Sequence, residues 1–210
     1  MRIAIIACGS RGDVQPYLAL GRAHGLEFWP LSGNVKSVAE SPEMRALLEK
    51  GNFPAIMRQA GQALQVAARN WARERLAACQ GMDTLMAGFG GLFTGAAIAE
   101  KLNLPLIQAH YVPFTPTRVF PAALFPAGIA RLGGATHRLS HHRMRQVMCR
   151  QARTANGPAR QQVLGLPAAP FAGPYHVRPL AHTPVLYDFN PVVIARAADW
   201  AAPQSPGDGG

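Results

Sequence analysis

The sequence predicts an α/β fold, a doubly wound parallel sheet covered by helices on both faces. Three observations support this prediction. The chain opens with a short apolar run over residues 3–7, and a turn rich in glycine follows it at once. Short apolar runs and helical patterns then alternate along the chain, as they do in parallel sheets. Hydrophobic residues make up 49% of the 210 residues and charged residues only 15%, which is enough apolar matter for a folded core.

The strands are expected where short apolar runs are bounded by turn residues. The first run ends at Cys8-Gly9, and His24-Gly25 turns the chain before the second run. Prolines between Pro113 and Pro126 interrupt the pattern, so a long loop is expected there. We expect strands over residues 2–8, 26–31, 84–87, 105–109, 185–187 and 192–194.

The helices are expected where apolar residues recur every three or four positions. Pro42 is typical of a helix start and Gly51-Asn52 of a helix end, and a longer helical pattern follows them. One face of that longer helix consists of Ile56, Ala60, Leu64, Ala67, Trp71 and Leu76. We expect helices over residues 14–23, 42–50, 55–79, 94–102 and 136–156.

The turn between the first strand and the first helix carries one carboxylate, that of Asp13. In open α/β sheets the ligand crevice lies beyond the carboxyl ends of the strands, where this turn is expected. Gly9 and Gly12 permit a tight turn and the close approach of a substrate. A carboxylate just before a helix can also be the helix N-cap, but Pro16 would then lack one of the N–H groups that such a cap binds. The residues themselves leave two roles open for Asp13, a helix cap or a carboxylate that faces the crevice.

The long loop after the fourth expected strand is rich in aromatic residues. Phe114, Phe120 and Phe125 form either an ordinary core under the loop or an apolar acceptor pocket, in which Thr115 and Thr117 would be the polar groups. His110, at the start of this loop, is either a packed core histidine or a functional one. The sequence leaves both pairs of alternatives open.

The chain is strongly basic, with a formal net charge of +10 and a pI near 10.6. No carboxylate lies between Glu100 and Asp188, whereas Lys101 and nine arginines do. The helix over 136–156 carries Arg138, Arg143, Arg145, Arg150 and Arg153, and Met144, Met148 and Ala152 recur on one face with Val147 beside them. This pattern fits a solvated helix or one that docks on an anionic membrane surface. Nucleic acid is not expected as a partner, because no binding module accompanies the arginines.

Cysteine and histidine spacing gives no indication of a metal site. The three cysteines are widely separated and form no CxxC pair, and His141-His142 has no partner ligands at metal spacing. The apolar run before Cys8 is shorter than the roughly 7–15 residues of a signal peptide, and no run approaches the ~18 residues of a membrane span. We therefore expect a cytoplasmic protein, with peripheral membrane attachment as the alternative.

The stretch GSRGDVQPYLALGR, residues 9–22, resembles the start of the GT-B glycosyltransferases of the sterol glucosyltransferase group. Segments over residues 25–31, 95–105, 111–118, 184–187 and 198–200 are similar to later parts of that family and follow in the same order. The resemblance thus covers most of residues 1–200. It implies a Rossmann-like, acceptor-side N-terminal domain over 1–200, and we expect 201–210 to be a disordered tail.

The family resemblance also implies a reaction. In this family a hexose is transferred with inversion from a nucleotide sugar, here expected to be UDP-glucose, to a hydroxyl of an apolar acceptor such as a sterol or lipid. The residue that matches Asp13 is the base, and no cofactor beyond the nucleotide sugar is expected. The substrate is expected to be surrounded by the turn residues Gly9, Ser10, Arg11 and Gly12, by Gly90 and Gly91, and by Phe114, Thr115 and Thr117.

Two departures from the family affect what is expected of this chain. The sequence runs from Arg22 almost directly into the segment that resembles the third strand, so about one βα unit is absent. The C-terminal domain that binds the nucleotide sugar is also missing, so the donor would come from a missing or separate domain. The alternative is a non-catalytic, membrane-docking or acceptor-presenting subunit of a split glycosyltransferase, or an inactive fragment.

Overall fold

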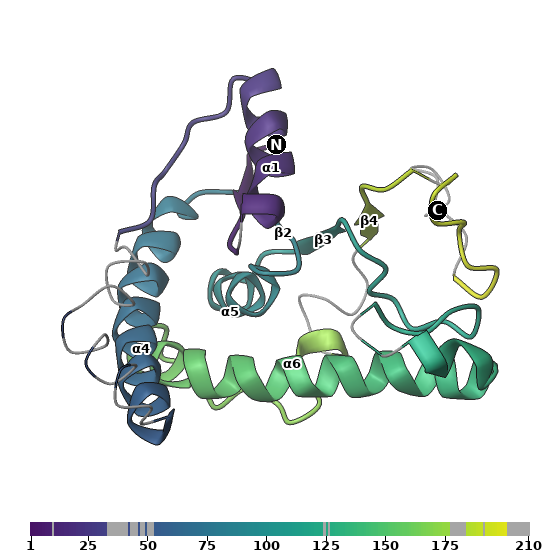
Figure 1. The fold of residues 1–210 in the computed structure, drawn as a ribbon. Helices are drawn as coiled ribbons and strands as arrows, with labels where there is room; N and C mark the ends of the chain where they lie inside the picture. Colours follow the sequence, from purple (N-terminus) through teal and green to yellow (C-terminus); the bar gives the residue numbers. More distant parts are fainter. Residues whose placement is uncertain are drawn as a thin grey trace. The chain divides into compact units, whose positions relative to one another are not determined.

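The computed structural model describes residues 1–9, 11–32, 53–123, 125, 127–176, 184–190 and 192–200, together with the single positions 42, 46 and 49 (Figure 1). The strands are β1 (Ile3–Ile6), β2 (Thr84–Ala87), β3 (Leu106–His110) and β4 (Val185–Tyr187). The main helices are α1 (Arg11–Ala23), α4 (Phe53–Ala78), α5 (Leu92–Leu102) and α6 (Gly134–Gln162). Two short 3-10 helices cover Ala127–Arg131 and Pro174–His176.

The strands form one sheet in the order β1-β2-β3-β4. β1 and β2 are parallel, with Ile3 opposite Thr84, and β2 and β3 are parallel, with Leu85 opposite Leu106. β4 follows at the edge next to β3, and the amide of Gln108 donates to the carbonyl oxygen of Pro184. The predicted α/β class with a parallel, Rossmann-like sheet is confirmed.

By its contacts the chain divides into two compact units. The first unit contains Met1–Ala109 and Cys149–Leu186, and the second contains His110–Met148 and Tyr187–Gly210. The expected domain over 1–200 stays a prediction, and the expected tail lies outside the described residues. Within the part of the chain that the structure describes, no helix has both the length and the apolar character needed to cross a membrane.

The core of the first unit is built from small and aliphatic side chains. Leu85 and Ala87 of β2 are fully buried, α5 contacts this strand, and Ile98 and Ala99 of α5 are fully buried as well. The helix can approach the sheet closely because it has glycine at position 95, where a Cβ would lie 2.9 Å from the Cβ of Ala87. The small-residue pattern of the expected helix over 94–102 is therefore explained by close packing on β2.

The long helix expected over 55–79 is present as α4, but its buried face differs from the predicted one. Ala68, Ala72 and Arg75 of α4 are buried, as is Cys79 just after the helix. Ala68 and Ala72 form a buried cluster with Ala159 of α6. Trp71 lies outside this row, and its ring N–H donates to the carbonyl oxygen of Ser32, 2.5 Å away. The side chains of Ile56, Ala60 and Leu64 lie outside the described residues.

Two expected strands are wrong. Residues 26–31 form no strand, and Leu26, Phe28 and Trp29 are exposed. Instead of pairing with the sheet, this segment is tied at its end to α4, because the amide of Ser32 donates to a carboxylate oxygen of Glu74 at 2.9 Å.

Residues 192–194 form a turn and not a strand. The carbonyl oxygen of Asn190 accepts from the amides of Val193 and Ile194, and its side-chain oxygen accepts from the amide of Val192 at 2.8 Å. Asparagine side chains often stabilise turns in this way, which here overrides the β-branched composition. Most of the helix expected over 42–50 lies outside the described residues.

The turn at residues 88–91 joins the carboxyl ends of three strands. A Cβ on Gly90 would overlap the carbonyl oxygen of Cys8, just after β1, and one on Gly91 would lie 2.6 Å from the carbonyl oxygen of Ile6. A Cβ on Gly88 would meet the Tyr17 hydroxyl, which itself donates to the carbonyl oxygen of Ala109 at 2.6 Å. Only glycine fits at these positions, because backbone packs directly on backbone.

We predict that Gly90→Ala destabilises the fold, because the new methyl group would collide with the Cys8 carbonyl group, which cannot move without displacing β1. Overpacking of this kind costs about 1–3 kcal/mol. Urea unfolding followed by circular dichroism measures the loss.

The matched control is Gly157→Ala, in the C-terminal part of α6, where a Cβ would meet no atom within 4 Å. This change should stabilise the protein by about 0.5–1 kcal/mol, because alanine favours helix over glycine. If both variants unfold at the wild-type urea concentration, the close contact at Gly90 is not a constraint on the fold.

Candidate functional site

The candidate site begins where β1 ends and α1 starts. Gly9 has φ +132°, a conformation that residues with a side chain rarely adopt, so glycine is required at this turn. α1 begins at Arg11, three residues earlier than predicted, so Asp13 lies within its first turn and is not its N-cap. Pro16 lies inside α1 and has no N–H, which leaves the carbonyl oxygen of Gly12 without its usual partner within the helix. A carboxylate in the first turn is stabilised by the positive end of the helix dipole.

The predicted site residues of the first unit lie at one edge of the sheet. Gly9 is exposed in the turn after β1, Arg11 and Gly12 are exposed at the start of α1, and Ser10 lies outside the described residues. Gly90 and Gly91 follow β2 and touch the backbone at the end of β1, so the structure brings both turns together. Their glycines are explained by this packing, and a role in substrate binding stays a prediction.

A buried arginine lies behind the first turn. The Nη2 of Arg75 donates to the sulfur of Cys8 at 2.7 Å, and its guanidinium group lies over the ring of Trp71, 5.7 Å from the ring centre. This contact ties α4 to the residue that precedes Gly9. The sequence analysis missed this contact, because it predicted a different buried face for α4, one that does not include Arg75.

The remaining predicted site residues lie in the second unit and are held by hydrogen bonds. The Tyr187 hydroxyl donates to the Thr115 hydroxyl at 2.6 Å and accepts from the Thr115 amide at 2.7 Å. The Thr117 hydroxyl donates to Asp199, whose second oxygen accepts from the Arg118 amide at 2.8 Å. These bonds hold the pKa of Asp199 below its ordinary value, the Thr117 hydroxyl contributing most. Phe114 and Thr117 are fully buried, and whether this loop also binds an acceptor stays a prediction.

Aromatic stacking completes this cluster. The rings of Tyr187 and Trp200 stack 4.9 Å apart, and the Trp200 ring N–H donates to the carbonyl oxygen of Thr115. The loop over 111–118 and the segments 184–187 and 198–200, three of the stretches that carry the family resemblance, are therefore bound to one another. Their residue types serve the packing of the second unit.

Two histidines of the second unit are buried. Burial, together with the nearby charge of Arg145, lowers the pKa of His110 to about 4. Burial likewise lowers the pKa of His141, whose Nε2 lies 3.1 Å from the carbonyl oxygen of Phe120. His110 is thus a packed histidine, one of the two alternatives that the sequence leaves open. Within the described ranges, no group of three or more His, Cys, Asp or Glu side chains could hold a metal ion.

The basic helix expected over 136–156 is present as the longer α6, but its arginines differ in environment. Arg138, Arg143, Arg150 and Arg153 are exposed. Arg145 instead donates to the carbonyl oxygen of Phe114 at 3.2 Å and lies over the Phe114 ring. Val147 is exposed and does not continue the buried row of Met144, which corrects the predicted apolar face.

The parallel sheet with an acidic turn after its first strand and a glycine turn after its second defines the chain as a Rossmann-like α/β protein. No family model matches it. Fungal sterol 3-beta-glucosyltransferases are similar to it over 95–96% of its length, with 30% identity for that of Neurospora crassa and 29% for those of Pichia angusta and Cryptococcus neoformans. The predicted resemblance to the sterol glucosyltransferase group is confirmed.

The chain spans only 13–17% of the length of these relatives. The alignments extend over 223–228 positions, more than the 210 residues of the chain, so the relatives carry residues within the aligned region that this chain lacks. The expected absence of about one βα unit after the first helix stays a prediction.

We predict that the protein loses stability as the pH falls from about 6.5 to about 4, the interval between the ordinary pKa of histidine and that of His110. In this interval the unfolded chain binds a proton at position 110 and the folded chain does not, so protonation favours unfolding. Each such histidine contributes at most about 1.4 kcal/mol per pH unit. Urea unfolding at several pH values measures the slope.

His110→Phe should flatten this slope, and the part that remains is assigned to His141, whose pKa is lowered in the same direction. His24→Phe, at an exposed position, is the matched control and should leave the pH dependence as in the wild type. A slope that is unchanged in His110→Phe would contradict the assignment.

Proposed function

We propose that this chain supplies the acceptor side of a hexosyl transfer reaction. The acceptor is a sterol or a similar apolar alcohol, and the donor is a nucleotide sugar, UDP-glucose by the family resemblance. The main support is the similarity to sterol 3-beta-glucosyltransferases along almost the whole chain. The position of Asp13 in the first turn of α1, at the edge of the sheet where α/β proteins bind ligands, agrees with this proposal.

In the proposed reaction Asp13 takes the proton of the acceptor hydroxyl as its oxygen attacks the anomeric carbon of the sugar. The bond to the nucleotide breaks on the opposite side, so the configuration inverts. The rate gain comes chiefly from holding the carboxylate against the hydroxyl. Charge on the departing nucleotide needs electrostatic stabilisation, which a donor-binding domain would supply.

We predict that the chain alone binds a sterol but transfers no glucose from UDP-glucose, and that transfer appears when the separately produced C-terminal half of the Neurospora crassa relative is added. Asp13→Asn should then lower transfer by about 10²–10⁴-fold and leave sterol binding unchanged. Radiolabelled glucose in the sterol fraction measures transfer.

The matched control is Asp83→Asn, a carboxylate just before β2 and therefore at the opposite edge of the sheet. It should keep full transfer. Robust transfer by the chain alone would contradict the need for a donor domain, and full transfer by Asp13→Asn would contradict the role of Asp13.

A second candidate function is docking on an anionic membrane surface, where apolar acceptors reside. α6 contains no acidic residue, and its exposed positions include Arg138 and Arg143. Two exposed apolar side chains, Leu139 and Val147, lie among them and are 53% and 56% exposed. Arginines interleaved with exposed apolar side chains are typical of helices that lie on anionic leaflets.

We predict that the protein sediments with vesicles that contain anionic lipid and is released as salt rises, because exposed charges are screened within about 8–10 Å near physiological ionic strength. Arg143→Glu should weaken vesicle binding by about tenfold. Arg22→Glu, exposed near the end of α1, is the control for the same change in net charge. Equal sedimentation with neutral and anionic vesicles would leave α6 an ordinary solvated helix.

A further inference from the structure

A cavity of about 390 Å³ lies within the first unit, between α5 and the second half of α6, and residues 164–174 contribute to its wall. Its size falls in the range of small-molecule sites, about 300–1,000 Å³. The space exists because the facing helices carry small side chains. Ala96, Ala97, Ala152 and Ala159 line it, and Ala72 of α4 adds to the same wall.

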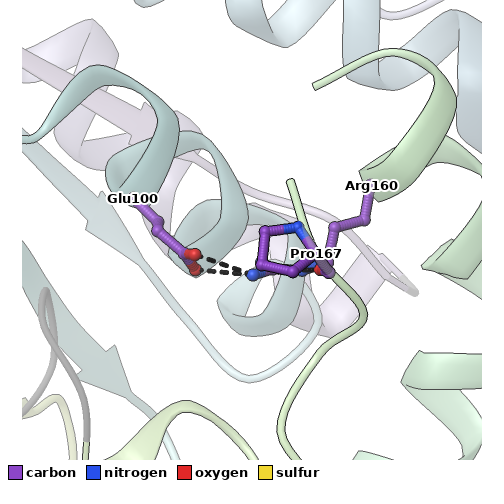
Figure 2. Close-up of polar contacts among 3 residues, drawn as sticks. All are labelled: Glu100, Arg160 and Pro167. Carbon is purple, nitrogen blue, oxygen red and sulfur yellow. Dashed lines mark hydrogen bonds and ion pairs between the residues drawn. The ribbon is translucent and has the colours of Figure 1, made fainter. Parts of the chain in front are cut away.

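The acidic side chain of this cavity is already neutralised. Glu100 is the one carboxylate among the described residues that line it, and both its oxygens accept from Nη2 of Arg160, at 2.8 and 2.9 Å. Figure 2 shows this pair, with Glu100 on α5 facing Arg160 on α6. Arg160 is itself buried, and its Nε donates to the carbonyl oxygen of Pro167 at 2.6 Å. This pair therefore anchors the wall and leaves no net charge there.

Two further arginines at the cavity keep their positive charge toward solvent. Arg150 and Arg153 line the cavity and are exposed. Arg153 is held over the ring of Phe171, with 5.8 Å between its guanidinium carbon and the ring centre. Thr94 and Asn156 add uncharged polar groups to the lining. The cavity thus combines an apolar interior with a cationic rim.

We propose that this cavity binds a single-chain amphiphile with an anionic head group, its hydrocarbon chain between α5 and α6 and its carboxylate or phosphate at Arg150 and Arg153. The small apolar walls favour a flexible chain, and the charge of the rim selects an anion over a neutral alcohol. The site is separate from the turn that holds Asp13, and it does not depend on the proposed glycosyl transfer.

Calorimetric titration of the purified chain tests this proposal with dodecanoate, dodecyl phosphate, decanoate and dodecanol. Both twelve-carbon anions should bind at one site, and dodecanol should bind at least tenfold more weakly. Decanoate should bind about tenfold more weakly than dodecanoate, because two fewer methylene groups are buried.

Three variants locate the site. Arg150→Gln combined with Arg153→Gln should weaken the binding of both anions at least tenfold and leave that of dodecanol unchanged. Arg22→Gln, an exposed arginine on α1 and outside the cavity, is the matched control and should bind dodecanoate as the wild type does. Ala152→Leu fills the cavity and should abolish the binding of all four ligands.

A labelling experiment avoids any dependence on how the variants fold. Cys149 lines the cavity, whereas Cys8 and Cys79 do not. Dodecanoate should therefore slow the alkylation of Cys149 and leave that of the other two cysteines unchanged, as peptide mapping can measure. Equal binding of dodecanol and dodecanoate, or equal protection of all three cysteines, would overturn the proposal.

Discussion

The contact between the glycine turn at 88–91 and the end of β1 is the constraint on which the candidate site depends. Gly90 and Gly91 let the backbone after β2 lie directly on the carbonyl groups of Cys8 and Ile6. Any side chain there would separate the two strands at their carboxyl ends. The turn that carries Asp13 starts from this junction, and Tyr17 ties α1 to the end of the third strand through Ala109. The start of α1, whose first turn contains Asp13, therefore depends on positions where no side chain fits.

The arginines of this chain have two different roles, although the sequence shows a single basic run. Arg75, Arg145 and Arg160 point inward and hold backbone or side-chain partners, so their charge serves to join elements. Arg138 and Arg143 remain exposed. The net charge of +10 overstates the basic surface, because some of the arginines that contribute to it are buried. Part of what remains lies on α6, which has no carboxylate to offset it.

Three of the segments that resemble the sterol glucosyltransferases contribute residues to the packing of the second unit. Thr115 bonds to Tyr187, Thr117 bonds to Asp199, and Trp200 stacks on Tyr187. Three stretches far apart in the sequence thus depend on one another for their polar partners. A motif that is recognisable across relatives can mark such a packing cluster as readily as it marks a binding site.

The sequence by itself determined the class of fold, the strands β1 to β4 and the four helices that carry the unit cores, because hydrophobic periodicity and glycine or proline punctuation act locally. It also indicated the turn before Asp13 and the resemblance to the sterol glucosyltransferases. Only the tertiary structure decided which apolar runs pair: residues 26–31 and 192–194 have strand-like composition, but Ser32 is bound by Glu74 and Asn190 forms a turn. The tertiary structure likewise decided which face of α4 is buried and which arginines are buried. The reason is that strand pairing and ionic contacts join residues far apart in the chain, and periodicity along the sequence carries no information on which distant partner will be there.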